Sequence, residues 1–301
     1  MNYRLAMRAF SLLTVLSMMN VVQCSKSREA RAVTTLVTGQ VSVTYDGRKP
    51  IALNVGDEVR RGAVVTTEAM SSATIQLNEV GIVRIAENSR LELKSIIAEN
   101  GATELKLESG AIFSRVLKRP GTEYRVQTPT LVASVRGTEF MVTSDWSRGG
   151  VFVREGTVAV STPVDKTEKP VTVKKRAAVG SDGRAVVVPQ VRVEELILEK
   201  HALQPYIENI ETKKPAEIEK VFKKIEVEER AIDQKIEDIK LTALQKLKKQ
   251  GKPLVRLFLR DGSQIIGSVE ETTAAGLKLD TGESVIEIPK GDIRRRVPEQ
   301  Q

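Results

Sequence analysis

Short runs of alternating hydrophobic and polar residues fill the first large part of the chain, from Thr35 to about Val188. In Gln40–Tyr45 and Ala73–Leu77, for example, aliphatic or β-branched side chains return at every second position, and a turn signal such as Asp46-Gly47 follows. Alternation at period two indicates strands with one face in a core and one face in solvent. The pattern therefore predicts an all-β unit, which we assign to residues 35–190.

From Val191 the sequence becomes rich in Glu and Lys, and its apolar residues return at helical spacing. Two prolines divide this segment, so we expect a short helix near residues 192–202 and a long helix from about 215 to 250, with Gly251-Lys252-Pro253 as its stop. The apolar stripe is narrow, which indicates a helix that packs on a neighbouring domain or pairs with a second helix as in a coiled coil. Its members are Ile218, Val221, Phe222, Ile225, Ile232, Ile236, Ile239, Ala243 and Leu247.

Strand patterns return after Pro253. Four apolar runs joined by glycine-containing turns predict strands at 254–259, 264–270, 277–279 and 285–288. This segment resembles a small Sm-like or SH3-like barrel, so we assign residues 253–301 to a small β-barrel. We expect the long helix to pack against this barrel and stabilise it. We interpret Arg294-Arg295-Arg296 as a solvated end.

The first 23 residues have the pattern of a signal peptide: Arg4 and Arg8 precede an apolar run over residues 9–22. The chain's single cysteine, Cys24, follows immediately, in an arrangement that resembles a bacterial lipobox. Val21 and Gln23 stand where Leu and a small residue are usual, which is similar to spirochaetal lipoproteins. We therefore expect lipidation at Cys24 and a tether over residues 24–34; the alternative is an ordinary secretory signal with an incidental cysteine.

Composition narrows the possible partners. The formal net charge is +8, but Lys and Arg are spread among nearly as many Asp and Glu, and aromatic residues make up only 4% of the chain. A nucleic-acid binder would concentrate basic and aromatic residues on one face, so we expect no nucleic-acid partner. No apolar run after the leader approaches the roughly 20 residues that a membrane-spanning helix needs.

Catalytic motifs are missing from the sequence. The single histidine, His201, falls on a predicted charged helix without a cysteine or a second histidine at metal-binding spacing, so we expect it at the surface. We predict that the protein is not an enzyme and that it uses no cofactor and no metal.

Seven segments in the first unit resemble the FecR domain, a periplasmic module, over about Val37 to Val160. They are Val37–Val41, Asn54–Val59, Gly62–Thr67, Arg84–Leu93, Leu107–Phe113, Val126–Phe140 and Val153–Val158. The resemblance implies a β-sandwich or a short β-solenoid. Regulators of this family carry an anti-sigma segment and a membrane helix before the domain; we expect neither here and therefore do not expect their direct signalling role.

The segment Arg136-Gly137-Thr138-Glu139-Phe140 is the most distinctive part of this resemblance. Arg136 follows an apolar run, so we expect its guanidinium to be at least partly buried, with strand-end carbonyls or Glu139 as its partners. A structural role for this motif is the first interpretation, and ligand binding is the alternative.

These observations predict a mainly β, non-catalytic lipoprotein of the cell envelope, held to the outer membrane or to the periplasmic face of the inner membrane by acyl chains. We expect it to bind an envelope protein or a glycan. Two alternatives remain: a scaffold that forms homo-oligomers through residues 215–250, and a surface adhesin that binds host or matrix molecules.

Overall fold

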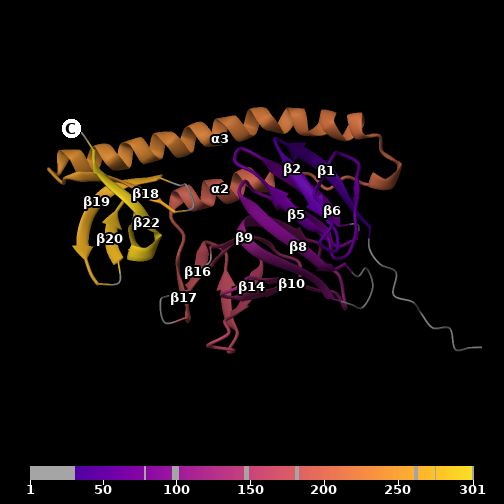
Figure 1. Cartoon of the computed structure of the whole chain (residues 1–301), viewed down its shortest axis with the longest axis horizontal. Coiled ribbons are helices and arrows are strands. Elements are labelled where there is room, and N and C mark those ends of the chain that lie inside the picture. The colour runs from indigo at the N-terminus through magenta and orange to yellow at the C-terminus, as the bar shows by residue number, and fades with distance from the viewer. Residues whose placement is uncertain are drawn as a thin grey trace, which may run out of the picture.

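The computed structural model describes residues 31–77, 79–96, 102–145, 149–179, 183–260, 264–274 and 276–299. Strands account for 49% of the structure and helices for 21%, so the prediction of a mainly β protein is confirmed. The strands form a two-layered sandwich and a separate C-terminal sheet, and the long helix α3 (Pro215–Lys249) runs above both (Figure 1).

One layer of the sandwich, which we call the covered layer, lies beneath the helices. Each strand pairs antiparallel with the next. In spatial order it contains β4 (Glu58–Val59), β1 (Ala32–Thr38), β6 (Ser72–Leu77), β7 (Gly81–Ile85), the second half of β9 (Ala102–Val116), β12 (Glu139–Ser144), β13 (Gly149–Glu155), β16 (Lys175–Val179) and β17 (Ala185–Pro189).

In the part of the chain that the structure describes, no helix covers the outer face of the other layer, which we call the open layer. Its strands pair antiparallel except for β9 and β10, which are parallel. In spatial order it contains β3 (Ile51–Ala52), β2 (Val41–Thr44), β5 (Val64–Thr67), β8 (Ser89–Ser95), the first half of β9, β10 (Glu123–Gln127), β11 (Val132–Val135), β14 (Thr157–Ser161) and β15 (Lys169–Thr172).

Strand β9 belongs to both layers and changes the side of its core-facing residues where it crosses. Leu105 and Leu107 face the core in its first half, whereas Ile112 and Ser114 face it in the second half. Gly110 lies at the crossing with a φ of +91°, and a Cβ atom there would lie 2.5 Å from the Cα of Ser89. Glycine is therefore required both by the backbone conformation and by the close approach of β8.

Apolar side chains from both layers meet in one core. Tyr124 and Phe140 are its largest members, and their rings pack edge to face with centroids 6.2 Å apart. The hydroxyl of Tyr124 lies 2.9 Å from the hydroxyl of Ser114, and burial raises the pKa of the phenol well above its ordinary value. The alternating pattern of the sequence thus becomes the inner faces of two sheets.

The outer face of the covered layer is crossed by helix α2 (Arg192–Ala202) and the segment that follows it, with the 3-10 turn η1 (Ile210–Thr212). We call residues 192–214 the strap. Leu198 and Ala202 pack on Phe113 and Met141, while Ile207 and Ile210 belong to a second apolar cluster near β1. The strap therefore passes over the strands in turn, from β16 to β1.

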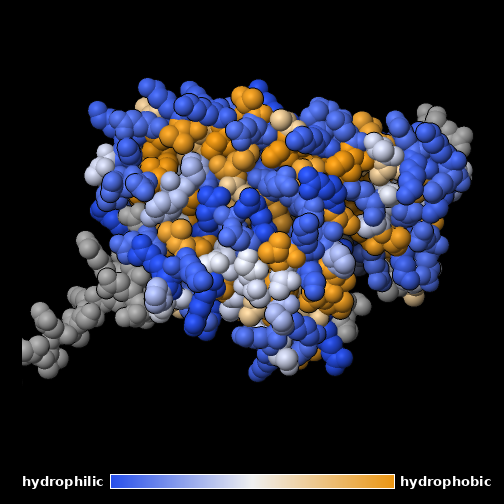
Figure 2. Space-filling view, turned by 180° about the vertical axis from the view of Figure 1, so that it is seen from behind, coloured by the Kyte–Doolittle hydropathy of each residue, from blue (hydrophilic) through white to orange (hydrophobic). Residues whose placement is uncertain are grey.

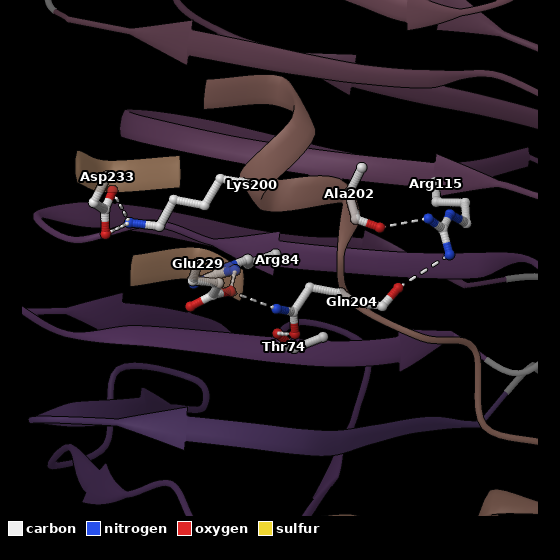
Figure 3. A network of polar contacts seen from close by, with 8 residues as sticks. All are labelled: Thr74, Arg84, Arg115, Lys200, Ala202, Gln204, Glu229 and Asp233. Atoms are coloured by element: carbon white, nitrogen blue, oxygen red, sulfur yellow. Dashed lines mark hydrogen bonds and ion pairs between the residues drawn. The ribbon is translucent and has the colours of Figure 1, made fainter. Parts of the chain in front are cut away.

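Polar contacts fix the strap to the strands beneath it (Figure 3). Arg115 donates to the carbonyls of Ala202 (2.6 Å) and Gln204 (3.0 Å). The amide of Gln204 accepts from the hydroxyl of Thr74 (3.0 Å) and donates to Glu229 of α3 (3.1 Å). These groups would otherwise be buried without partners, so the network favours one position of the strap.

Helix α3 starts at Pro215, in the first-turn position where proline is tolerated, and ends before Gly251, which adopts a φ of +71°. The predicted boundaries of both helices are confirmed. Within the apolar stripe, Ile218, Phe222, Ile236, Ala243 and Leu247 are buried inside the chain. Figure 2 shows the molecule from the side opposite to Figure 1. Along its upper edge, where α3 lies, the surface is mainly hydrophilic, and apolar residues lie just beneath. A coiled coil is therefore not supported, because most of the stripe packs against the rest of the chain and only Val221 among its members is exposed.

The C-terminal unit is a five-stranded antiparallel sheet in the order β21-β20-β19-β18-β22, with its own core around Leu257 and Leu279. The sheet is open, so the expected closure into a barrel is not seen. The turn at Gly282 rests on the backbone of Ala243, and Lys252 pairs with Asp280 at 2.7 Å. Its strands are β18 (Leu254–Leu259), β19 (Gln264–Thr272), β20 (Gly276–Asp280), β21 (Val285–Pro289) and, after turn η2 (Lys290–Asp292), β22 (Ile293–Pro298).

The edge strands of the sandwich limit further strand pairing. At one edge, β3 and β4 have only two residues each. At the other edge, the ammonium group of Lys169 donates to the carbonyl of Ala185 on β17 at 2.8 Å, and Pro189 has no N–H to offer. Both are devices that keep an edge strand from pairing with another chain.

The crossing of β9 gives a test of the fold. We expect Gly110→Ala to destabilise the protein by clearly more than Gly47→Ala, because Gly47 also has a positive φ (+68°) but has nothing within 4 Å of an added Cβ. The control substitution should cost about 1–2 kcal/mol of unfolding free energy, from backbone strain alone. Urea unfolding of both variants measures the difference; equal costs would contradict the assigned role of Gly110.

The network under α3 gives a second test. Arg84 and Glu229 form an ion pair in which only 8% and 17% of the two side chains are exposed. Replacing Glu229 by Gln should lower the unfolding free energy by about 3–5 kcal/mol, because it leaves a buried guanidinium without its counter-charge. The matched control is Glu226→Gln, since Glu226 and Arg230 lie 3.9 Å apart with 58% and 80% of their side chains exposed and should contribute less than about 1 kcal/mol. Similar losses from the two variants would show that burial of the pair does not matter.

Candidate functional site

Several loops of the sandwich emerge at the same end. The register of the covered layer sets Ala32 level with Val59 and Leu77, Gly81 level with Val116, and Glu139 level with Arg115 and Glu155. The segments just beyond these residues therefore lie side by side along one rim. From β4 to β16 there are seven strand spacings of about 4.8 Å, which make this rim about 34 Å wide.

This rim carries more basic than acidic side chains; the exposed acids in the same loops are Asp46, Glu58, Glu79 and Glu155. Arg119 lies 3.5 Å from Glu79, and the other basic members form no ion pair with any described residue. We call the set the basic rim; its exposed members are Arg48, Lys49, Arg60, Arg61, Lys118, Arg119, Arg136, Lys174 and Lys175.

The opposite rim carries mainly acidic side chains. The turns next to β5 and β7 expose Glu68 and Glu87, and the loop before β15 carries Asp165 and Glu168 with Lys166 among them. Asp165 pairs with Lys169 at 3.3 Å, and hydrogen bonds from Thr167 and Lys169 lower the pKa of its carboxyl group. The two rims of the sandwich thus differ in charge: one has an excess of basic side chains and the other an excess of acidic ones. This difference gives the sandwich a preferred orientation in an external electric field.

Tyr45 holds the loops of the basic rim together where β2 ends. Its carbonyl accepts from the N–H of Arg48 at 2.8 Å, and its hydroxyl lies 3.4 Å from the N–H of Arg60 and 3.5 Å from the carbonyl of Glu58. Arg31, the first described residue, lies 3.8 Å from the carboxylate of Glu58. The chain therefore enters the sandwich at the basic rim.

The predicted burial of Arg136 is wrong. Arg136 is exposed in the turn between β11 and β12, and it belongs to the basic rim. Gly137 has a φ of +65°, and a Cβ atom there would lie 2.7 Å from the Cβ of Lys118, so the turn is pressed against the loop after β9. The apolar run ends at Val135, and the glycine turn then directs the arginine outward.

The other residues of the motif have structural positions. Thr138 is buried, and its hydroxyl donates to the carbonyl of Thr157 at 3.2 Å. Glu139 does not pair with Arg136; its carboxylate binds Arg115 at 2.6 Å and also binds Arg154. Phe140 is fully buried in the core. Arg115 also holds the strap, so Glu139 links the motif to the end of α2.

His201 was expected at the surface, and this prediction is wrong. Its ring stacks on Phe113 with centroids 6.3 Å apart, and its Nδ1 atom is buried without a hydrogen-bond partner. Desolvation, with Arg84 and Lys200 nearby, lowers the pKa of His201 from 6.5 to about 3. The sequence shows a charged helix but not which face meets the sheet. Cys24 lies outside the described residues, as does Trp146, which the sequence alone places at a hairpin tip.

The chemistry available at the basic rim is electrostatic. Among the residues that the structure describes there, no nucleophile and base are arranged together, and the basic side chains suit the binding of an extended anionic surface. In the described ranges, no three His, Asp or Glu side chains gather as metal ligands, and neither helix combines the length and apolar character of a membrane span.

Comparison with protein families gives a match within the sandwich. Residues 63–159 match the FecR protein family. This range, about a third of the 301 residues, contains most of the motif segments, and the predicted resemblance to the FecR domain is confirmed for it. The segments at 37–41 and 54–59 lie before the matched range. FecR proteins are associated with the cell envelope.

Comparison with solved structures gives only distant matches. Two crystal structures of a proposed anti-sigma factor from Parabacteroides distasonis, at 1.65 Å and 2.50 Å resolution, each align with 17% identity and a TM-score of 0.38. The alignment covers 42% of this chain and 59% of theirs, so the chain spans less than two thirds of their length. Comparison with curated proteins gave no match.

The basic rim was missed in the sequence because its members are scattered from residue 48 to residue 175. What these residues share in the sequence is that a Lys or Arg lies in or beside a turn, and that such turns follow roughly every second strand. Examples are Asp46-Gly47-Arg48, Pro120-Gly121 and Arg136-Gly137. Without the register of the strands, these turns cannot be assigned to one end.

The partly buried position of His201 predicts a pH dependence. Its pKa is lower in the folded protein (about 3) than in the unfolded chain (6.5), so protonation favours unfolding. The stability is fully present above pH 6.5 and falls with acidification by up to about 1.4 kcal/mol per pH unit. His201→Phe, which keeps the stacking on Phe113, should flatten the unfolding free energy between pH 6.5 and pH 4.5 relative to wild type in urea titrations; identical slopes would show that His201 is protonated without cost.

Proposed function

We propose that this chain is a lipid-anchored, non-catalytic module of the cell envelope, attached through Cys24 and binding through its FecR-type sandwich. The observation that carries the proposal is the match of residues 63–159 to FecR, in a chain that begins with a signal-like leader ending at a lone cysteine. An acylated cysteine supplies durable anchoring when several chains insert together, at about 0.8 kcal/mol per buried methylene.

The geometry of the chain supports this arrangement. Arg31 follows Cys24 by seven residues, which can span at most about 25 Å when fully extended. An anchor at Cys24 would therefore keep the basic rim close to the membrane and would direct the opposite rim away from it. The open layer has half-exposed polar side chains such as Glu92 and Lys106 on its outer face, which leaves that face available to an envelope protein or a glycan.

Self-association through residues 215–250 is the less favoured proposal. Ile236, which would lie in such an interface, is only 6% exposed and packs inside its own chain. An oligomer through this stripe would first have to displace the strap or the sheet. No particular feature favours the adhesin alternative, which requires display on the outer leaflet.

The anchor is tested by comparing wild type with Cys24→Ser. We expect wild type in the membrane fraction, with a mature N-terminus at Cys24 whose mass includes acyl chains. The variant should lose the acyl mass and move to the soluble envelope fraction, because no other lipidation site is available. The control is Ser25→Ala, which should leave both mass and fractionation as in wild type. Wild type recovered with Met1 and without acyl chains would overturn the proposal.

A further inference from the structure

The motif and the fold give the basic rim no task. Basic side chains repel one another, and aligning them along one edge has an electrostatic cost in the isolated protein. Apart from Arg119, they form no ion pair with any described residue. An anionic partner that extends over the rim would relieve this repulsion.

We propose that the basic rim docks on an anionic phospholipid surface and sets the orientation of the sandwich against the membrane. The inference deepens the proposed function and rests on it, because the anchor at Cys24 is what brings the rim to a membrane. The first argument is that β1 begins at this rim, so the residues that link it to Cys24 join the sandwich there. Arg31 lies at this rim and not at the opposite one, where Glu68 and Glu87 are exposed.

The form of the rim favours a lipid surface over a compact anion. Its charges come from separate loops along an edge about 34 Å wide, and they do not converge on a single point. A row of separate point charges is suited to a layer of headgroups, each of which is free to move to a cation.

Two exposed apolar residues support the same partner. Ile51 is 58% exposed at the start of β3, beside Lys49 and Pro50, and Val173 is 46% exposed in the turn before Lys174. They lie at opposite ends of the basic rim. Apolar side chains beside basic ones are typical of surfaces that enter the headgroup region, where both the charge and the apolar area are accommodated.

The strength of docking follows from the number of charges. Each Lys or Arg close to an anionic membrane contributes about a fivefold increase in the partition coefficient at low ionic strength. Removing three from the rim should therefore weaken binding about 100-fold. The effect should fade as salt is added, because the Debye length is only about 8 Å at 0.15 M ionic strength.

The test uses the chain from Ser25 to Gln301, which carries no acyl group and keeps every described residue. Its binding to vesicles of phosphatidylcholine mixed with phosphatidylglycerol is measured by co-sedimentation and compared with binding to pure phosphatidylcholine vesicles. The rim variant is Arg60→Gln/Lys118→Gln/Arg136→Gln. The matched control is Lys249→Gln/Arg294→Gln/Arg296→Gln, which removes the same charge from exposed sites outside the sandwich. Thermal melting shows that both variants are folded.

We expect binding to the anionic vesicles only, lost about 100-fold in the rim variant and retained in the control. No preference for phosphatidylglycerol, or equal losses in the two variants, would overturn the inference. Binding of a single-stranded polynucleotide with the same dependence on the rim would also overturn it, by showing a general polyanion site. The assay needs no acyl chain, so its failure is separate from a failure of anchoring at Cys24, which N-terminal mass spectrometry reports.

Discussion

The sandwich depends on one strand that serves both of its layers. Strand β9 can do so because Gly110 permits a backbone conformation and an approach to Ser89 that a side chain would prevent. On either side of the crossing, opposite faces of the strand turn toward the core, so a single continuous segment closes the two sheets onto each other. Once β9 is placed, the register of its neighbours in the covered layer follows, and with it the level at which their loops end.

That register converts a scattered set of charges into a surface. Taken along the chain, Lys and Arg are mixed with Asp and Glu, and the net charge of +8 indicates only a mild excess. In the fold, loops that are more than a hundred residues apart in sequence come to one rim. Arg31 lies at the same rim, so the sign of the charge and the entry point of the chain coincide. The helices do not disturb this arrangement, because the strap and α3 cover the outer face of one layer and leave the rim exposed.

Much of the architecture could be predicted from the sequence, because it depends on local signals. Proline and glycine marked the limits of α2 and α3, and alternation marked the strands. Strand β22 was missed because Arg294-Arg295-Arg296 shows no alternation; pairing with β18 and the contact of Arg295 with the ring of Phe258, 4.3 Å away, hold it in the sheet. Arg136 and His201 were misplaced for a related reason. Their exposure is decided by tertiary contacts, namely the turn at Gly137 against Lys118 and the stacking of the helix on Phe113.

The protected edges of the sandwich have a meaning for a protein confined to a surface. Molecules tethered to a membrane share a thin layer and a common orientation, and they meet edge to edge far more often than the same number in free solution. A sandwich with unpaired strands at its sides would be prone to grow into ribbons under those conditions. Two-residue strands at one side, and Lys169 over the carbonyl of Ala185 with Pro189 at the other, keep each copy separate while it is crowded.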